Sequence, residues 1–257
     1  MRTTLLPGLL QNLRRSRDHQ ATGARLYELG RTYRPDPQGG EKTRPVAFEE
    51  LRLAGVLHGQ REERTWTAKE SQVDFFDGKG AVEAVLQVLR IAGAVFRPLD
   101  TPVLHPRAAA AVELNGDRLG QLGELHPRVC KKLGLPGGII VFELDADLLF
   151  RRAHLIPTYQ PLSRFPAVLR DLAVVVDVQL PSEEVRQLIR EVGGPLVEDA
   201  ALFDVYTGSQ LAAGQKNLAY AIRYRAPDRT LTDAEANEAH QRIVEEVKRR
   251  VGGTLRA

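Results

Sequence analysis

The chain has 257 residues, of which 43% are hydrophobic and 27% are charged, so it can bury the core of an ordinary globular protein. Its 36 basic and 33 acidic residues leave a formal net charge of +3, a bias too small to identify a polyanionic partner. The single cysteine, Cys130, excludes an internal disulfide and a cysteine-rich zinc site and is typical of a reducing cytoplasm, and no apolar run reaches the length of a membrane span.

Leucines near the N-terminus recur at the spacing of one helix face: Leu5, Leu6, Leu9, Leu10 and Leu13. We therefore expect an opening amphipathic helix. Strands are predicted at 24–33, 51–58, 109–114, 118–125 and 138–144, a turn-rich loop at 34–44 and a helix at 77–90. Asn115-Gly116-Asp117 is a hairpin signal. The pattern indicates a helix-backed, mainly antiparallel sheet.

A proline-rich linker follows at 154–166, with Pro157, Pro161 and Pro166. Prolines with little apolar periodicity around them are typical of a connection between domains. We place the domain boundary near Pro161, which gives domains of residues 1–160 and 161–257.

The second half has a clearer pattern. Strands are predicted at 171–177, 198–206, 216–225 and 254–256. Ser182 is expected to cap a helix that ends at Gly193-Gly194, and Thr232 with Glu235 forms a capping box that opens a second helix. The resulting βαββαβ order is the ferredoxin-like split unit, which packs both helices on one sheet face.

Alternation along the strands predicts which side chains lie on the other, open face. The inward set is Ala201, Phe203, Val205, Leu218, Tyr220, Ile222 and Tyr224. The outward set is Ala173, Asp204, Tyr206, Ala219, Ala221, Arg223 and Arg225. An aromatic ring, a carboxylate, arginines and small residues are suitable for stacking and hydrogen-bonding an unpaired base.

Other candidate sites are weaker. Gly78-Lys79-Gly80 invites a phosphate-loop interpretation, but it lacks the spacing of that motif and is more often a turn and helix start. The six histidines show no ligand spacing. We expect no catalytic residue and no metal site in this chain.

Three segments of the second half resemble the anticodon-binding domain of the phenylalanyl-tRNA synthetase beta subunit: LSRFPAVLRDLAVVV (162–176), LFDVYTG (202–208) and KNLAYAIRYRAPDRTLTDAE (216–235). RTTLLPGLLQNLRRSRDH, LYELGRTY, FFDGKGAVEAVL, LHPRAAA and GQLGELHP resemble that subunit's catalytic-like domain. The resemblance covers nearly the whole chain in the family's order. It implies an α+β protein, with part of a class II synthetase-like antiparallel sheet followed by a ferredoxin-like domain.

The resemblance also implies roles. The family's anticodon contacts fall on Ala173, Asp204 and Tyr206, and Asn217 occupies a position that is often serine. Arg223 is added here as a phosphate contact. In the family the active site lies in the alpha subunit, so this chain is expected to be noncatalytic and without a cofactor, with ATP and Mg²⁺ serving the whole enzyme. The implied partners are the alpha subunit and the phenylalanine tRNA.

Two features of the sequence differ from what the resemblance would lead one to expect: the charge of the second half and the position of Met1 relative to the family. Residues 162–257 contain 13 lysines and arginines and 14 aspartates and glutamates, so binding through phosphates alone is not expected. Compared with the family, Met1 falls inside the catalytic-like domain, so the sequence is expected to be a fragment, an engineered piece or a shortened gene. A free-standing RNA-binding module and a protein-interaction module remain the alternative functions.

Overall fold

The computed structural model describes residues 1–35, 47–62, 65–67, 69–159 and 162–255. The chain divides into two compact units, unit 1 (Met1–Thr158) and unit 2 (Tyr159–Ala257). The predicted boundary residue, Pro161, lies outside the described residues.

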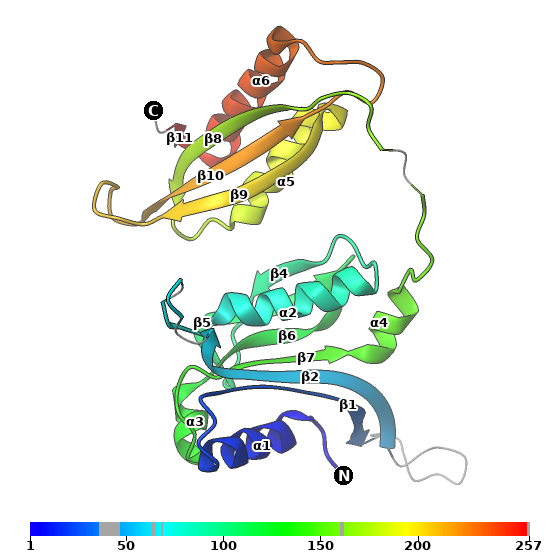
Figure 1. The fold of residues 1–257 in the computed structure, drawn as a ribbon, viewed down its shortest axis with the longest axis vertical. Coiled ribbons are helices and arrows are strands. Elements are labelled where there is room, and N and C mark those ends of the chain that lie inside the picture. Colours follow the sequence, from blue (N-terminus) through cyan, green and yellow to red (C-terminus); the bar gives the residue numbers. More distant parts are fainter. Residues whose placement is uncertain (36–46, 63–64, 68, 160–161, 256–257) are drawn as a thin grey trace. The chain divides into compact units, whose positions relative to one another are not determined.

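Unit 1 is an antiparallel sheet with helices on both faces (Figure 1). Its helices are α1 (Leu6–Asp18), α2 (Phe75–Val88), α3 (Pro127–Leu133) and α4 (Ala146–Arg152). Its strands are β1 (Gly23–Pro35), β2 (Ala47–Glu62), β3 (Ser71–Gln72), β4 (Val95–Pro98), β5 (Leu104–Leu114), β6 (Asp117–Leu125) and β7 (Ile140–Asp145). They pair in the order β1-β2-β7-β6-β5-β4, and β3 pairs with β2.

Two clusters of buried side chains hold the layers of unit 1 together. The leucines of α1 pack with Val56 and Val141 on one face of the sheet. Val82 and Leu86 of α2 pack with Ile140 on the other face. The predicted leucine stripe of α1 is thus confirmed as core.

Local signals explain several element ends in unit 1. The backbone φ angles of Asn115 and Gly116 are 51° and 88°, as a tight β5–β6 hairpin requires. Asp74 and Asp77 form a capping box at the start of α2, so this helix begins two residues before the predicted start. The predicted loop is wrong at Arg34 and Pro35, which still belong to β1, and its remainder lies outside the described residues.

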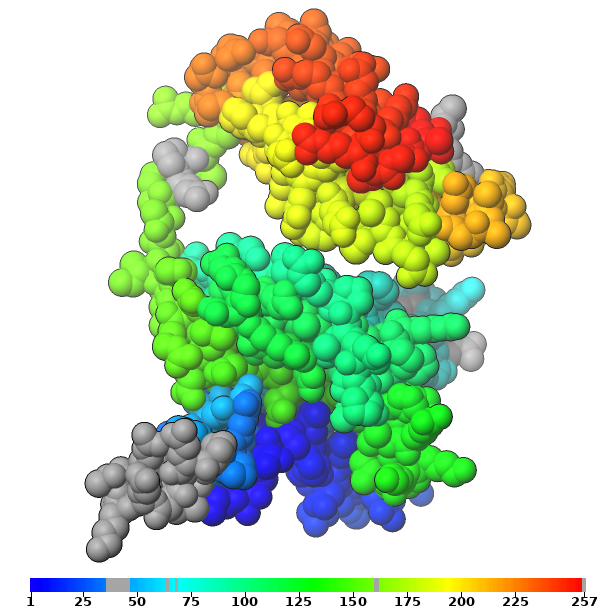
Figure 2. Space-filling view, turned by 180° about the vertical axis from the view of Figure 1, so that it is seen from behind, coloured from blue at the N-terminus to red at the C-terminus, as the bar shows by residue number. Residues whose placement is uncertain are grey.

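Unit 2 has the predicted ferredoxin-like order. Its strands are β8 (Val168–Asp177), β9 (Val197–Tyr206), β10 (Gln215–Tyr224) and β11 (Thr254–Leu255), and its helices are α5 (Ser182–Gly193), the short 3-10 helix η1 (Gly194–Leu196) and α6 (Asp233–Val251). The sheet order is β11-β8-β10-β9, all antiparallel. Helices α5 and α6 lie side by side on one face of this sheet (Figures 1 and 2).

The core of unit 2 lies between the two helices and the sheet. Alternate residues of β10 point into it and are fully or almost fully buried: Leu218, Tyr220, Ile222 and Tyr224. The Thr232–Glu235 capping box opens α6 as predicted.

The predicted Ser182 cap is wrong. Pro181 occupies the N-cap position and Ser182 is the first helical residue, so no side-chain bond caps α5. Ser182 contributes its carbonyl oxygen instead, which accepts a hydrogen bond of 2.6 Å from the Tyr220 hydroxyl.

Candidate nucleic-acid interface

The face of the unit 2 sheet opposite α5 and α6 carries the residues predicted to bind RNA. In an antiparallel sheet, directly paired residues point to the same side. Asp204 pairs with Ala219, which pairs with Ala173 across the next strand. Because Ala219 lies between Leu218 and Tyr220, which point into the core beneath the helices, this row lies on the open face. We call it the Asp204 row.

A second row lies beside the Asp204 row. Tyr206 pairs with Asn217, Asn217 pairs with Val175, and Val175 pairs with Thr254 of β11. We call it the Tyr206 row. Adjacent same-face rows are two residues apart, about 7 Å along the strands. The structure therefore brings together four of the five predicted site residues. Thr254 was missed because no face was assigned to the short terminal strand.

The predicted inward set of β9 is largely wrong, because this strand does not alternate along its full length. Ala200, not Ala201, is the fully buried alanine, and Phe203 is 60% exposed. The pairing jumps from Asp204–Ala219 to Leu202–Tyr220, so Phe203 is an extra residue in a β-bulge. Val205 pairs with inward Leu218 but is half exposed at the strand end.

The bulge decides which face Asp204 and Tyr206 occupy. Counting by twos from buried Ala200 would put both residues on the helix side. The extra residue shifts that count by one and turns both side chains to the open face. Their outward placement was predicted correctly, but from an alternation that the strand does not follow.

Asn217 is the most constrained polar residue of the site. It is only 5% exposed, on the central strand β10. Its side-chain oxygen Oδ1 has no hydrogen-bond donor among the described residues. Buried acceptors are normally satisfied, so this oxygen is ready to accept a hydrogen bond from a ligand or from water.

Tyr206 lies against the loop that follows β9. A β carbon on Gly208 would lie 2.0 Å from the Tyr206 hydroxyl oxygen, so a larger residue there would require the ring to move from its present position. The ring is half-buried, while Asp204 is exposed. The site thus combines a ring held at one edge, an exposed carboxylate and a buried amide oxygen.

Arg223 lies on the predicted face but away from the two rows. It is six residues from Asn217 along β10, about 20 Å at the rise of a strand. Its guanidinium is half exposed and lies 3.9 Å from the Glu198 carboxylate. Arg225, predicted to be outward, follows the strand; its guanidinium lies 3.2 Å from Glu198 and donates to the carbonyl oxygen of Phe165 at 3.0 Å. Both arginines are therefore partly neutralised by an acid.

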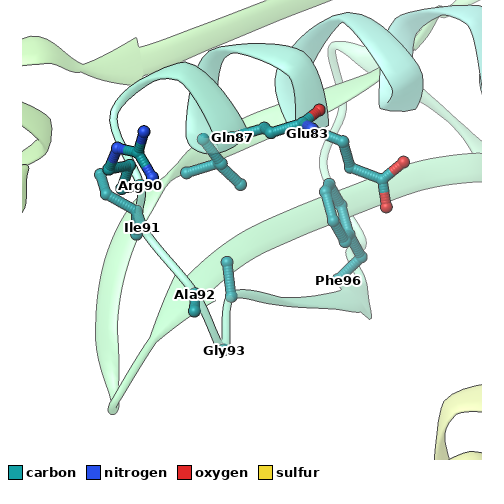
Figure 3. Close-up of a pocket in the computed structure, with 9 residues that line it drawn as sticks. Glu83, Gln87, Arg90, Ile91, Ala92, Gly93 and Phe96 are labelled. Carbon is teal, nitrogen blue, oxygen red and sulfur yellow. The ribbon is translucent and has the colours of Figure 1, made fainter. Parts of the chain in front are cut away.

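Two surface hollows of unit 1 are lined by described residues, none of which is a predicted site residue. One, of about 480 Å³, lies between the end of α2 and the start of β4. Figure 3 shows the Phe96 side chain pointing toward α2 on the side where Glu83 lies, with Arg90 toward the other end.

The other hollow, of about 530 Å³, is lined by charged residues of β1, β2, β6 and β7. Several of these groups already satisfy one another. Arg34 lies 3.0 Å from Glu50, and Glu143 accepts hydrogen bonds of 2.8 Å from the Thr4 hydroxyl and the Leu5 amide. These contacts give the charges a structural role in holding the start of α1.

The remaining candidate groups have ordinary structural roles. Gly78, Lys79 and Gly80 lie inside α2 and form no phosphate loop. Cys130 is buried, and burial raises the pKa of its thiol. In the described residues, no three histidine, cysteine, aspartate or glutamate side chains are grouped as a metal site would require. No helix there is long and apolar enough to cross a membrane.

Known proteins match the chain along its entire length. Residues 1–146 match the phenylalanyl tRNA synthetase beta chain CLM domain, and residues 163–256 match the ferredoxin-fold anticodon binding domain. Phenylalanine–tRNA ligase beta subunits are similar over the whole chain: that of Anaeromyxobacter dehalogenans is 48% identical, that of Moorella thermoacetica 43% and that of Symbiobacterium thermophilum 40%. The chain covers 32%, 31% and 28% of these relatives, about a third of their length. The chain therefore belongs to the phenylalanyl-tRNA synthetase beta subunit family.

Proposed function

We propose that the chain acts as part of a phenylalanine–tRNA ligase, in which unit 2 recognises unpaired bases of the tRNA anticodon loop. Unit 1 serves as a noncatalytic scaffold that contacts the alpha subunit. Activation of phenylalanine, with ATP and Mg²⁺, belongs to that other subunit, and the complete enzyme works in the cytoplasm.

The observation that carries the proposal is the pair of adjacent rows on the open face. Tyr206 offers a flat ring for stacking, and Ala173 and Ala219 are small enough to let a base approach the sheet. Asp204 and the Asn217 oxygen are both hydrogen-bond acceptors. The site therefore suits a base edge that presents N–H donors.

The charge of unit 2 sets the expected strength of binding. Residues 162–257 carry 13 basic and 14 acidic side chains, and Arg223 shares Glu198 with Arg225. Few phosphates can be neutralised by such a surface, so the salt dependence of binding should be shallow. Selectivity comes from base contacts, and the chain alone binds weakly.

Binding titrations of the full chain with the tRNA anticodon stem-loop test the proposal. Tyr206→Ala should weaken binding roughly fivefold to a hundredfold, as the loss of base stacking does. Asp204→Asn should change the preference between cognate and anticodon-swapped stem-loops more than the affinity. Arg223→Ala should weaken binding to all sequences and reduce the salt dependence.

A matched control is Tyr159→Ala, which removes an 83% exposed tyrosine of unit 2 outside the sheet. It should bind like the parent. The proposal fails if Tyr206→Ala also binds like the parent while hydrogen exchange shows unit 2 still folded.

Separate experiments test the proposed role of unit 1 as a noncatalytic scaffold. The chain should co-purify with a cognate alpha subunit and should show no phenylalanine-dependent pyrophosphate exchange by itself. A chain that binds RNA but not the alpha subunit would instead favour the free-standing module. Robust exchange by the pure chain would contradict the noncatalytic assignment.

A further inference from the structure

Phe203 is the residue that the β9 bulge leaves without a partner in the sheet. Its side chain is 60% exposed and does not belong to the buried cluster beneath α5 and α6. Asp204 follows it directly. An exposed phenylalanine ring leaves apolar area in water that a flat partner would cover.

We propose that Phe203 is a second aromatic platform, which stacks an unpaired RNA base next to the one held at the Tyr206 row. The inference rests on the proposed function. It names a residue that regular alternation predicts to be core, whereas the structure places it in a β-bulge with its side chain 60% exposed.

The spacing of the two rings shows what Phe203 can hold. Phe203 and Tyr206 are three residues apart, about 10 Å along a strand. Enclosing one base between two rings requires them about 7 Å apart, twice the rise of about 3.4 Å per nucleotide. The backbone spacing of Phe203 and Tyr206 is larger, so the two rings suit neighbouring nucleotides better than one shared base. Stacking tolerates any base, so Phe203 adds affinity and reach without reading base identity.

The neighbouring side chains favour RNA over a protein surface at this position. The other exposed apolar residues of β9 are Leu202 and Val205, at 37% and 50% exposure. Both pair with inward-pointing residues of β10, so they point toward the helix side. Phe203 directly precedes Asp204, whose carboxylate lies on the open face, and is three residues from Tyr206. Protein docking sites are usually larger, contiguous apolar patches.

The test uses the full chain with RNA of two lengths, the anticodon stem-loop and a single-stranded trinucleotide of anticodon sequence. Phe203→Leu keeps apolar bulk but removes the flat ring, and should weaken stem-loop binding roughly fivefold to a hundredfold. The loss should be equal for cognate and anticodon-swapped stem-loops. The affinity loss from Phe203→Leu should be smaller for the trinucleotide than for the stem-loop. The loss from Tyr206→Ala should be seen with both RNAs. Phe203→Trp should restore stem-loop binding.

Val205→Ala is the matched control, because it trims a half-exposed apolar residue of the same strand. The inference is overturned if Phe203→Leu binds RNA like the parent while Tyr206→Ala does not, and the proposed function then survives. It is also overturned if Val205→Ala loses as much affinity as Phe203→Leu, or if Phe203→Leu disrupts only association with the alpha subunit. If Tyr206→Ala also keeps full affinity, the proposed function itself fails.

Discussion

Thr232 and Ser182 both lie at helix starts, but only Thr232 caps its helix with a side-chain hydrogen bond. Thr232 accepts a hydrogen bond from the Glu235 amide, and the Glu235 carboxylate accepts from the Thr232 amide. These contacts and Arg229 lower the pKa of Glu235 to about 2. Ser182, also a residue type favoured at N-caps, makes no such bond because Pro181 takes the N-cap position.

Thr232→Ala should therefore lower the free energy of unfolding of unit 2 by about 1 kcal/mol. Ser182→Ala should change it by a few tenths at most, since only its carbonyl is used. Hydrogen exchange of the α5 and α6 peptides in the full chain measures both. A Ser182→Ala loss as large as that of Thr232→Ala would show that the α5 cap had been misassigned.

His240 gives unit 2 a dependence on mildly acidic pH. Its Nδ1 atom lies 3.1 Å from the Tyr224 hydroxyl. Burial, and then the positive charge of Arg170, lower the pKa of His240 below its usual 6.5. As the pH falls below about 6.5, the unfolded chain takes up a proton that the folded chain resists, so stability decreases.

We expect the free energy of unfolding of unit 2, measured by hydrogen exchange of its β10 and α6 peptides, to fall as the pH is lowered from 7 to 5. His240→Gln should make this dependence on pH weaker. Glu235 acts in a separate window. Its lowered pKa stabilises the fold above about pH 4.5, and that contribution is lost as the pH falls toward 2. An unchanged slope between pH 7 and 5 in His240→Gln would remove histidine as the cause.

At the scale of elements, α2 contains two glycines with opposite requirements. A β carbon on Gly78 would lie 2.4 Å from the Ile140 side chain, so glycine lets the helix approach β7. A β carbon on Gly80 would meet nothing within 4 Å. Glycine inside a helix costs about 0.5–1 kcal/mol relative to alanine.

Gly80→Ala should therefore stabilise unit 1 by about 0.5–1 kcal/mol. Gly78→Ala should destabilise unit 1. Overpacking a core costs about 1–3 kcal/mol, and the gain from replacing a glycine inside a helix is to be subtracted from that cost. Hydrogen exchange of the α2 and β7 peptides distinguishes the two variants. Equal effects would mean that α2 does not depend on a close approach at Gly78.

The elements that were predictable share one property: their signal lies within the element. The alternation of β10 and the capping box of α6 are complete in consecutive residues, and both are confirmed. The β9 bulge depends on the register against β10, which the sequence of β9 does not contain. The short helices α3 and α4 have seven residues each, too few for a periodic pattern, and were not predicted. Asp204 and Tyr206 lie on the predicted face, but the prediction assumed a regular alternation along β9 that the bulge interrupts.

At the scale of the whole molecule, each unit contains buried clusters of its own. One cluster, with its partly buried neighbours, lies within residues 168–251, and the other two lie within residues 5–149. A domain with a hydrophobic core of its own can fold alone, so we expect unit 2 to unfold as a cooperative unit.

A piece containing residues 159–257 should therefore unfold cooperatively in urea, at the midpoint that unit 2 peptides show in the full chain. Urea unfolding followed by circular dichroism, with hydrogen exchange on the full chain, gives both midpoints. A piece without a cooperative transition would mean that unit 1 is needed to fold unit 2.

The β9 bulge also limits how this protein can change in length. Substitutions between Ala200 and Tyr206 alter one side chain at a time, but a one-residue insertion or deletion there would exchange the two faces for every residue up to the strand end. Residues 209–213 of the β9–β10 connection lie outside both strands, so insertions there leave the register intact. Relatives and engineered variants should accordingly carry length differences in that loop and keep the residue count of β9 constant.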